Sequence, residues 1–330
     1  MKLVITIDTE EDNWGIYSPS GATLKNIERI PDLQSLFDEF GASPTYLITY
    51  PVATDPKAQF ILDDIHRKGR CEIGAHCHPW NTPPFSETCS EKNSWLCNLP
   101  SSLQLEKIQV LTEEIAESFG VRPYSFRAGR WGFSETLGEH LAILGYKVDT
   151  SITPCLDWTS DHGPNFTEYS SVPFRLGPRK PVGEASLVSL VEIPASISYL
   201  QANAQLCQKV LSFAKRPFPQ FFRLPGVLAK LGLVNRIWLT PEFCDSTSMI
   251  RLAEAMRSHG VPIMNLSFHS TTLIAGLTPF VSTSSDEKTF LMRIREFLRY
   301  AKESGCEFHT LSTAAHAIAV EDGIEHPDTF

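Results

Sequence analysis

The sequence predicts an α/β fold, and within that class an α/β barrel, from two observations. Short runs rich in β-branched residues alternate along the chain with longer amphipathic stretches, which is the pattern of parallel strands joined by crossover helices. Apolar residues make up 42% of the 330 residues and charged residues 20%, a balance that can bury a large core. No linker divides the chain, so we expect residues 1–330 to form a single domain that ends in a frayed polar tail at 321–330.

Seven short apolar runs predict the strands of this barrel. The first is Leu-Val-Ile-Thr-Ile at residues 3–7, which carries no charge, as expected of a strand that is buried on both faces. The others lie at residues 44–48, 72–76, 124–127, 147–150, 187–193 and 261–266. Residues suited to metal binding or acid–base chemistry stand near the ends of several of these strands. In parallel α/β folds, ligands bind at the carboxyl ends of the strands.

Helices are expected between the strands. Residues 30–40 place four large apolar side chains at helical spacing, as in a helix that packs on a sheet. Further helices are expected at residues 60–68, 103–119, 134–144 and 247–259. Residues 151–186 and 216–244 are rich in Pro, Gly, Ser and aromatic residues, so they predict long loops that take part in function.

Charge and hydropathy exclude several classes of protein. The net charge is −9 and no basic cluster is present, which argues against nucleic acid as a partner. No run of about 18 apolar residues occurs, so no transmembrane segment is expected. The apolar run at residues 3–7 is too short for a signal peptide, and we therefore expect a cytoplasmic protein.

Four carboxylates follow the first predicted strand within five residues: Asp8, Glu10, Glu11 and Asp12. Such a group repels itself unless a cation or a basic side chain lies nearby. A solvated loop or the start of a helix is the alternative interpretation of this segment taken alone.

Two histidines at the end of the third predicted strand strengthen the case for a cation. His76 and His78 are separated by one residue, so on an extended chain both imidazoles point to the same face. Two neutral imidazoles together with a carboxylate suit a divalent metal ion, with zinc favoured and cobalt, iron, manganese or nickel as alternatives.

Five motifs follow one another in a recognisable order across residues 1–275. They are Asp8 with Glu10; Gly-Ala-His-Cys-His-Pro at 74–79; Phe-Arg-Ala-Gly-Arg-Trp-Gly at 126–132; the segment 150–158 ending in Asp157 and Trp158; and Leu-Ser-Phe-His at 266–269. In this order they resemble the motifs of the polysaccharide deacetylase family, also called the NodB-homology family. The family commonly has two adjacent aspartates in its first motif and a His-x-x-x-His second motif, so this chain resembles a variant subgroup associated with lipopolysaccharide and exopolysaccharide assembly.

The resemblance implies a distorted (β/α) barrel of about seven parallel strands with long loops at its C-terminal face. It also implies a metal-dependent hydrolase that removes an N-acetyl group from an amino sugar or a glycan intermediate. Glu10, His76 and His78 would hold the metal ion. Glu11 and Asp12 remain alternatives to Glu10 if the first strand turns early.

The resemblance also assigns roles to the remaining motif residues. Asp8 would act as the general base, and Arg127 would pair with it and keep it ionised. His269 would act as the general acid, with Asp157 tuning its charge. The residues expected to bind substrate are Tyr46, Trp80, Trp131, Trp158 and Leu266.

Two other functions remain open at this point. One is an amidohydrolase acting on a C–N bond outside a sugar, which a compact pocket without aromatic platforms would favour. The other is a glycan-binding barrel without catalytic activity, which a fully assembled metal site would argue against. The sequence does not determine the oligomeric state.

Overall fold

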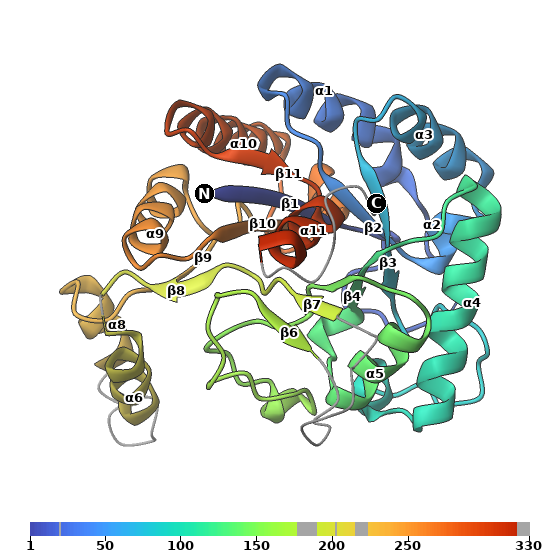
Figure 1. Ribbon diagram of the computed structural model, residues 1–330, viewed down its shortest axis with the longest axis horizontal. Helices are drawn as coiled ribbons and strands as arrows, with labels where there is room; N and C mark the ends of the chain where they lie inside the picture. Colours follow the sequence, from blue (N-terminus) through green and yellow to red (C-terminus); the bar gives the residue numbers. More distant parts are fainter. Residues whose placement is uncertain (20, 177–189, 202, 215–223, 322–330) are drawn as a thin grey trace.

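The computed structural model of the protein describes residues 1–19, 21–176, 190–201, 203–214 and 224–321 (Figure 1). Within these residues one curled, mostly parallel sheet has the strand order β10-β1-β2-β3-β4-β5-β7-β6, and β11 also pairs with β1. Only the β6–β7 pairing in this sheet is antiparallel. The strands are β1 (Lys2–Thr9), β2 (Thr45–Ile48), β3 (Glu72–Cys77), β4 (Ser125–Ala128), β5 (Val148–Asp149), β6 (Phe174–Leu176), β7 (Leu190–Glu192), β10 (Ile263–His269) and β11 (Glu307–His309).

All seven predicted parallel strands are present, so the predicted barrel-like α/β fold is confirmed. The strand expected at 187–193 appears as β7, and the residues before Leu190 lie outside the described part of the chain. The polar tail expected at 321–330 also lies outside it from residue 322 onward. The sequence did not reveal β6 or β11.

The first strand, β1, is an inner strand of the sheet, between β10 on one side and β11 and β2 on the other. Along one edge β1 pairs with β10, and along the other it pairs first with β11 and then with β2. This placement explains why the segment 3–7 is apolar and uncharged. The register sets Asp8 beside His269, and in the neighbouring β3–β4 pair it sets His76 beside Arg127.

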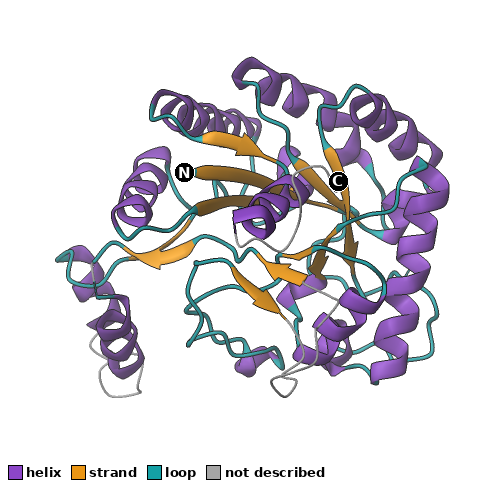
Figure 2. Cartoon of the chain, viewed as in Figure 1, coloured by secondary structure: helices purple, strands orange, loops and turns teal. Residues whose placement is uncertain are grey.

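Helices surround the sheet on its outer side (Figures 1 and 2). They are α1 (Ile30–Phe40), α2 (Tyr50–Thr54), α3 (Pro56–Arg67), α4 (Ser101–Phe119), α5 (Glu135–Ile143), α9 (Ser246–Ser258) and α10 (Ser284–Glu303). A further helix, α11 (Leu311–Glu321), covers one end of the barrel and packs against inward-facing residues of the strands, such as Val4. The five predicted helices correspond to α1, α3, α4, α5 and α9, whereas α2, α10 and α11 were not expected. No helix in the described residues is both long enough and apolar enough to cross a lipid bilayer.

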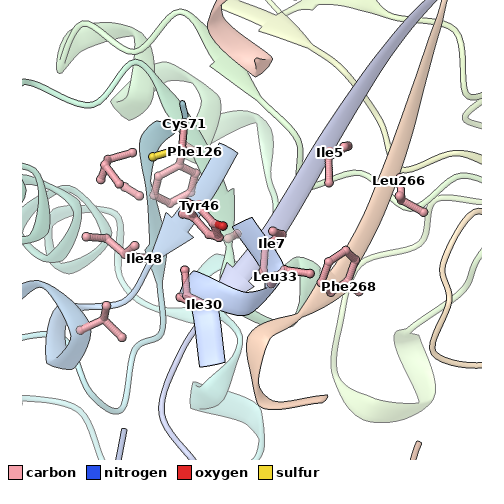
Figure 3. Packing of buried hydrophobic residues seen from close by; sticks show 14 of the residues in the cluster. Ile5, Ile7, Ile30, Leu33, Tyr46, Ile48, Cys71, Phe126, Leu266 and Phe268 are labelled. Atoms are coloured by element: carbon pink, nitrogen blue, oxygen red, sulfur yellow. The ribbon is translucent and has the colours of Figure 1, made fainter. Parts of the chain in front are cut away.

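The outward faces of the strands form the main hydrophobic core with these helices. Ile5 and Ile7 of β1 lie in it, next to Tyr46 and Leu266 of the adjacent strands (Figure 3). The register explains this, because Leu266 is opposite Ile5 and Tyr46 is opposite Ile7, and paired residues share a face of the sheet. The prediction that Tyr46 and Leu266 bind substrate is therefore wrong. Both side chains are fully buried in the core, and the Tyr46 hydroxyl donates a hydrogen bond to Gln34.

A second, antiparallel pair of strands stands beside the main sheet. It consists of β8 (Ile197–Tyr199) and β9 (Arg236–Trp238), and the helices α6 (Ala204–Ala214) and α8 (Leu224–Lys230) project beyond it in Figure 1. Leu239, just after β9, links this pair to the β10 edge, because its carbonyl accepts a 3.2 Å hydrogen bond from the Ser267 amide. The segments expected to be loops thus contain β6, α8 and β9, although most of 151–173 is irregular.

Candidate active site

The inward faces of the strands form a column that changes from apolar to polar along the barrel. Val4 lies at the apolar end, in a buried cluster to which α11 contributes Leu311. Thr6, two residues later, lies among buried polar groups, since its hydroxyl donates to Asn265 at 2.8 Å. Asp8 comes next on the same face, at the carboxyl end of β1. The strand period of two therefore places a carboxylate at the mouth of the barrel, above a closed apolar base.

Asp8 is paired with Arg127, as the resemblance to the deacetylase motifs implied. The Arg127 Nη1 atom lies 2.5 Å from Asp8 Oδ1, and both side chains are almost completely buried. Arg127 also donates to the Thr6 hydroxyl at 2.7 Å and to the Thr150 carbonyl at 3.1 Å, which fixes its orientation. Burial alone would raise the pKa of Asp8, but the charge of Arg127, with His76 and His269, lowers that pKa to about 2. The carboxylate is thus ionised at neutral pH.

Three side chains converge beside Asp8 with atoms that can bind a metal ion. These are Glu10, His76 and His78, whose ligand atoms all lie within 4.8 Å of one another. The Oε2 atom of Glu10 is 3.4 Å from His78 Nε2 and 3.8 Å from His76 Nε2. For comparison, two ligands about 2.1 Å from a tetrahedral zinc ion lie roughly 3.4 Å apart.

The rings of both histidines are held so that Nε2 faces Glu10. His76 Nδ1 is 3.1 Å from the Arg127 carbonyl, to which it donates when the ring is neutral. Burial lowers the pKa of His76 to about 3, so its imidazole is neutral and able to bind a metal ion. His78 is stacked on Trp80, with ring centroids 4.1 Å apart, and its Nδ1 faces Glu11 at 3.6 Å.

Of the three candidate carboxylate ligands, Glu10 is the one whose oxygen lies with the Nε2 atoms of His76 and His78. The carboxylate of Glu11 lies behind the His78 ring, where it accepts hydrogen bonds from Asn81 at 2.5 Å and Thr49 at 3.1 Å. Asp12 is turned away and accepts bonds from the backbone and side chains of the segment 23–26. Glu11 therefore lies beside His78 Nδ1, on the opposite side of the ring from Glu10, and Asp12 anchors a loop.

The environment of Glu10 fits a cation. The Glu10 side chain is only 9% exposed, and within the described residues its carboxylate accepts no hydrogen bond. Burial raises the pKa of Glu10 to about 7, and the negative charges of Glu11 and Asp8 also raise it. A buried carboxylate without donors, facing two free imidazole nitrogens, is stabilised by a bound divalent ion.

His269 stands on the other side of Asp8, with its Nε2 atom 3.6 Å from Asp8 Oδ2. Its partner is Glu242, whose Oε1 atom is 3.0 Å from both His269 Nδ1 and the His269 amide nitrogen. Burial alone would lower the pKa of His269, but the Glu242 carboxylate and the charges of Glu10 and Asp8 raise it to about 10. The imidazole is therefore protonated at neutral pH.

The prediction that Asp157 tunes the charge of His269 is wrong. Asp157 is exposed, and its carboxylate accepts hydrogen bonds from the amide and hydroxyl of Thr159, at 3.0 and 2.7 Å. These bonds form a local turn of the Asx type. Glu242, which sequence reasoning missed, occupies the position next to His269. The sequence signal available for Glu242 was a carboxylate four residues after Trp238, within the segment 216–244 that was expected to be a functional loop.

The converging residues form the floor of a pocket of about 330 Å³, a volume within the usual range for small-molecule sites. Trp80, Trp131 and Trp158 line it, in agreement with their predicted position. The chain has six tryptophans, and the other three also line this pocket: Trp14, Trp95 and Trp238. The pocket thus combines a charged floor with aromatic walls.

Solved structures with the same architecture carry descriptions related to the motifs. A protein from Mycobacterium smegmatis described as a polysaccharide deacetylase matches with a TM-score of 0.55 and 18% identity, over 97% of this chain and 91% of the other. A glycoside hydrolase/deacetylase from Parabacteroides distasonis gives a TM-score of 0.59 at 11% identity, over 97% and 71% of the two chains. The chain has the polysaccharide deacetylase fold.

This fold is not confined to deacetylases. The Puue allantoinase also matches, with a TM-score of 0.52 and 12% identity over 98% of this chain and 92% of the other. No family model and no curated protein matches the sequence. The similarity therefore establishes the polysaccharide deacetylase fold for this chain, and its activity has to be argued from the site.

A glycine packed against one of the candidate metal-binding histidines gives a first testable prediction within this fold. A Cβ atom at Gly129 would lie 2.2 Å from Cδ2 of His78 and 2.8 Å from the Cys77 carbonyl oxygen. Gly129→Ala is therefore expected to displace the His78 ring and to lower zinc affinity at least about tenfold, the range found when the support of a ligand is lost. The measurement is a zinc titration against a competing chelator.

The matched control is Gly226→Ala, because a Cβ atom at Gly226 meets no atom within 4 Å. Its zinc affinity should equal that of the unmodified protein. Equal affinities in both variants would show that the His78 ring is not held by contact with Gly129.

Proposed function

We propose that the chain is a metal-dependent N-deacetylase that removes the acetyl group from an amino sugar or a glycan intermediate. The observation that carries this proposal is the arrangement around Asp8: an ionised carboxylate lies between a Glu-His-His ligand set and a protonated histidine. Zinc is the proposed metal, since two imidazoles and a carboxylate are common zinc ligands.

In the proposed reaction a metal ion held by Glu10, His76 and His78 would supply positive charge that polarises the amide carbonyl and favours deprotonation of a water molecule. Asp8 accepts the proton of the attacking water as a C–O bond forms. The buried ion pair with Arg127 keeps Asp8 ionised and oriented. His269 then donates its proton to the amine nitrogen as the C–N bond breaks, and the products are acetate and a free amino group.

The walls of the pocket support a sugar as substrate. Aromatic rings offer broad apolar surfaces on which the C–H faces of a sugar ring can pack, and six tryptophans surround this site. A small cyclic amide would need fewer such surfaces. The motif resemblance supports an intermediate of lipopolysaccharide or exopolysaccharide assembly. The assembled ligand set supports catalysis over a purely glycan-binding role.

The proposal is tested by measuring the metal content of the purified protein together with acetate release from a panel of N-acetylated amino sugars, before and after chelation. We expect about one metal ion per chain and acetate release that stops on chelation and returns with zinc. Metal binding without acetate release from any sugar would overturn the deacetylase assignment in favour of another amide substrate. Absence of metal under every loading condition would overturn the metalloenzyme assignment.

The contact between Glu242 and His269 makes a prediction about pH dependence. Glu242→Gln removes the negative charge that holds the pKa of His269 near 10, so this pKa should fall. Because His269 acts in its protonated form, the alkaline decline of kcat/KM should move to lower pH. The measurement is kcat/KM for acetate release across the pH range.

Glu39→Gln provides the control, because Glu39 forms a surface ion pair with Arg295. Its pH profile should match that of the unmodified enzyme. If Glu242→Gln leaves the alkaline decline in place, His269 is not the acid whose charge Glu242 sets.

A further inference from the structure

An arginine on the wall of the same pocket is held in an unusual way. Arg130 and Trp131 both have left-handed backbone conformations, with φ values of 55° and 62°. Residues other than glycine adopt this region rarely, and two in succession are rarer still. Strained conformations of this kind concentrate at functional sites, where the surrounding structure maintains them. Here the strained turn follows β4, the strand that carries Arg127, and brings both side chains into the lining of the pocket.

The guanidinium group of Arg130 is clamped between two aromatic rings. Its central carbon lies 4.7 Å from the centroid of the Tyr17 ring and 4.4 Å from the centroid of the Trp95 ring. Its Nη1 atom donates a 2.6 Å hydrogen bond to the Ser94 hydroxyl. The side chain is thus fixed on three sides, and binding a ligand would cost little further conformational entropy.

Within the described part of the chain, this fixed cation has no carboxylate partner. Among the described residues no acidic oxygen lies within 4.0 Å of its nitrogens, and the Ser94 bond uses one of its five N–H donors. The other arginine of the pocket differs, because Arg127 is neutralised by Asp8. Asp161 also lines the pocket but forms no ion pair with Arg130. An oriented guanidinium group with unused donors matches the geometry of a carboxylate or a phosphate.

We propose that Arg130 is a specificity-determining residue that binds an oxyanion, either a carboxylate or a phosphate, carried by the substrate. The proposal rests on the deacetylation proposed above and narrows its substrate class to acidic amino sugars. The acetyl group would lie over Asp8 and the ligand set, and the oxyanion would lie against the clamped guanidinium group on the pocket wall. Neither Arg130 nor its clamp takes part in the hydrolytic step.

The experiment compares three sugars on the zinc-loaded protein: N-acetylglucosamine, its 1-phosphate, and the uronic acid with a carboxylate at the sixth carbon. Binding is measured by calorimetry and acetate release by kcat/KM, for the unmodified protein, Arg130→Met and Arg130→Lys. We expect at least one charged sugar to be preferred over the neutral one. Arg130→Met should reduce that preference about 10- to 100-fold, as loss of a charge-assisted hydrogen bond does, and should change the neutral sugar less than about twofold.

The two charged sugars distinguish a phosphate from a carboxylate as the group that Arg130 recognises. Arg130→Lys keeps the charge but loses the planar fork, so it should retain part of the preference, and the retained part should be larger at low ionic strength. Arg67→Met is the matched control, because Arg67 is a surface arginine paired with Asp63. Arg67→Met should bind the three sugars and release acetate from them as the unmodified protein does.

Two results would overturn the proposal. One is equal binding, or no binding, of the charged sugars relative to the neutral one. The other is an equal loss for all three sugars in Arg130→Met, which is the signature of a residue that only supports the Tyr17 and Trp95 loops. Selective binding of a charged sugar without acetate release would instead leave the role of Arg130 in place and overturn the deacetylase assignment.

Discussion

Asp8→Asn is expected to lower kcat/KM for acetate release by about 10²- to 10⁴-fold, the usual contribution of a general acid or base. The asparagine has almost the same shape and still offers Arg127 an oxygen acceptor, but it cannot accept a proton from water. The ligand atoms of Glu10, His76 and His78 are unchanged, so the metal should remain bound. The measurements are steady-state kinetics and metal content on the same preparation.

The ion pair makes a stability measurement necessary for this variant. Arg127 is buried, and removing the charge of its partner destabilises the fold, by up to about 3–5 kcal/mol for a fully broken buried pair. Thermal unfolding should therefore show a lower midpoint with the fold retained. Asp157→Asn is the matched control, because this motif aspartate is exposed and its carboxylate accepts hydrogen bonds from Thr159, so the variant should keep full activity. Full activity of a folded Asp8→Asn protein would exclude Asp8 as the base.

His76→Ala is expected to remove the metal and the activity together. Its Nε2 atom is one of three ligand atoms, and its Nδ1 atom faces the Arg127 carbonyl at 3.1 Å, so the substitution deletes a ligand that is already correctly oriented. Loss of an outer-sphere partner alone costs about 10- to 100-fold in metal affinity, and loss of the ligand itself should exceed this. Zinc should be absent after dialysis, and acetate release should fall to background.

His259→Ala is the control for this substitution, since His259 is exposed at the end of α9. That variant should retain one metal ion per chain and full activity. If His76→Ala keeps both its zinc and its activity, the Glu-His-His set is not the metal site. Recovery of activity at high zinc concentration would agree with the prediction, because weakened affinity is restored by mass action.

The sequence by itself determined the architecture and most of the candidate site. Its seven apolar runs form parallel strands. A strand that is buried on both faces needs a nearly continuous run of apolar residues, and such runs can be recognised in the sequence. The pair His76 and His78 points to one face because a strand repeats every two residues, which is a local rule. The order of the motifs placed Asp8 and Arg127 at strand ends. In the structure these residues meet, since parallel strands end at one edge of a sheet.

The tertiary structure alone decided everything that depended on register or on distant loops. Whether Tyr46 and Leu266 face the pocket or the core is set by their pairing with β1, and a shift of one residue would have reversed the answer. Glu242 meets His269 across 27 residues of chain, and no local pattern specifies that contact. The tryptophans are scattered from residue 14 to 238, and only the packing of separate loops brings all six to one pocket. The sequence determines which chemical groups are present and which face of a strand they share. The partners of each group depend on how segments that are remote in sequence pack together.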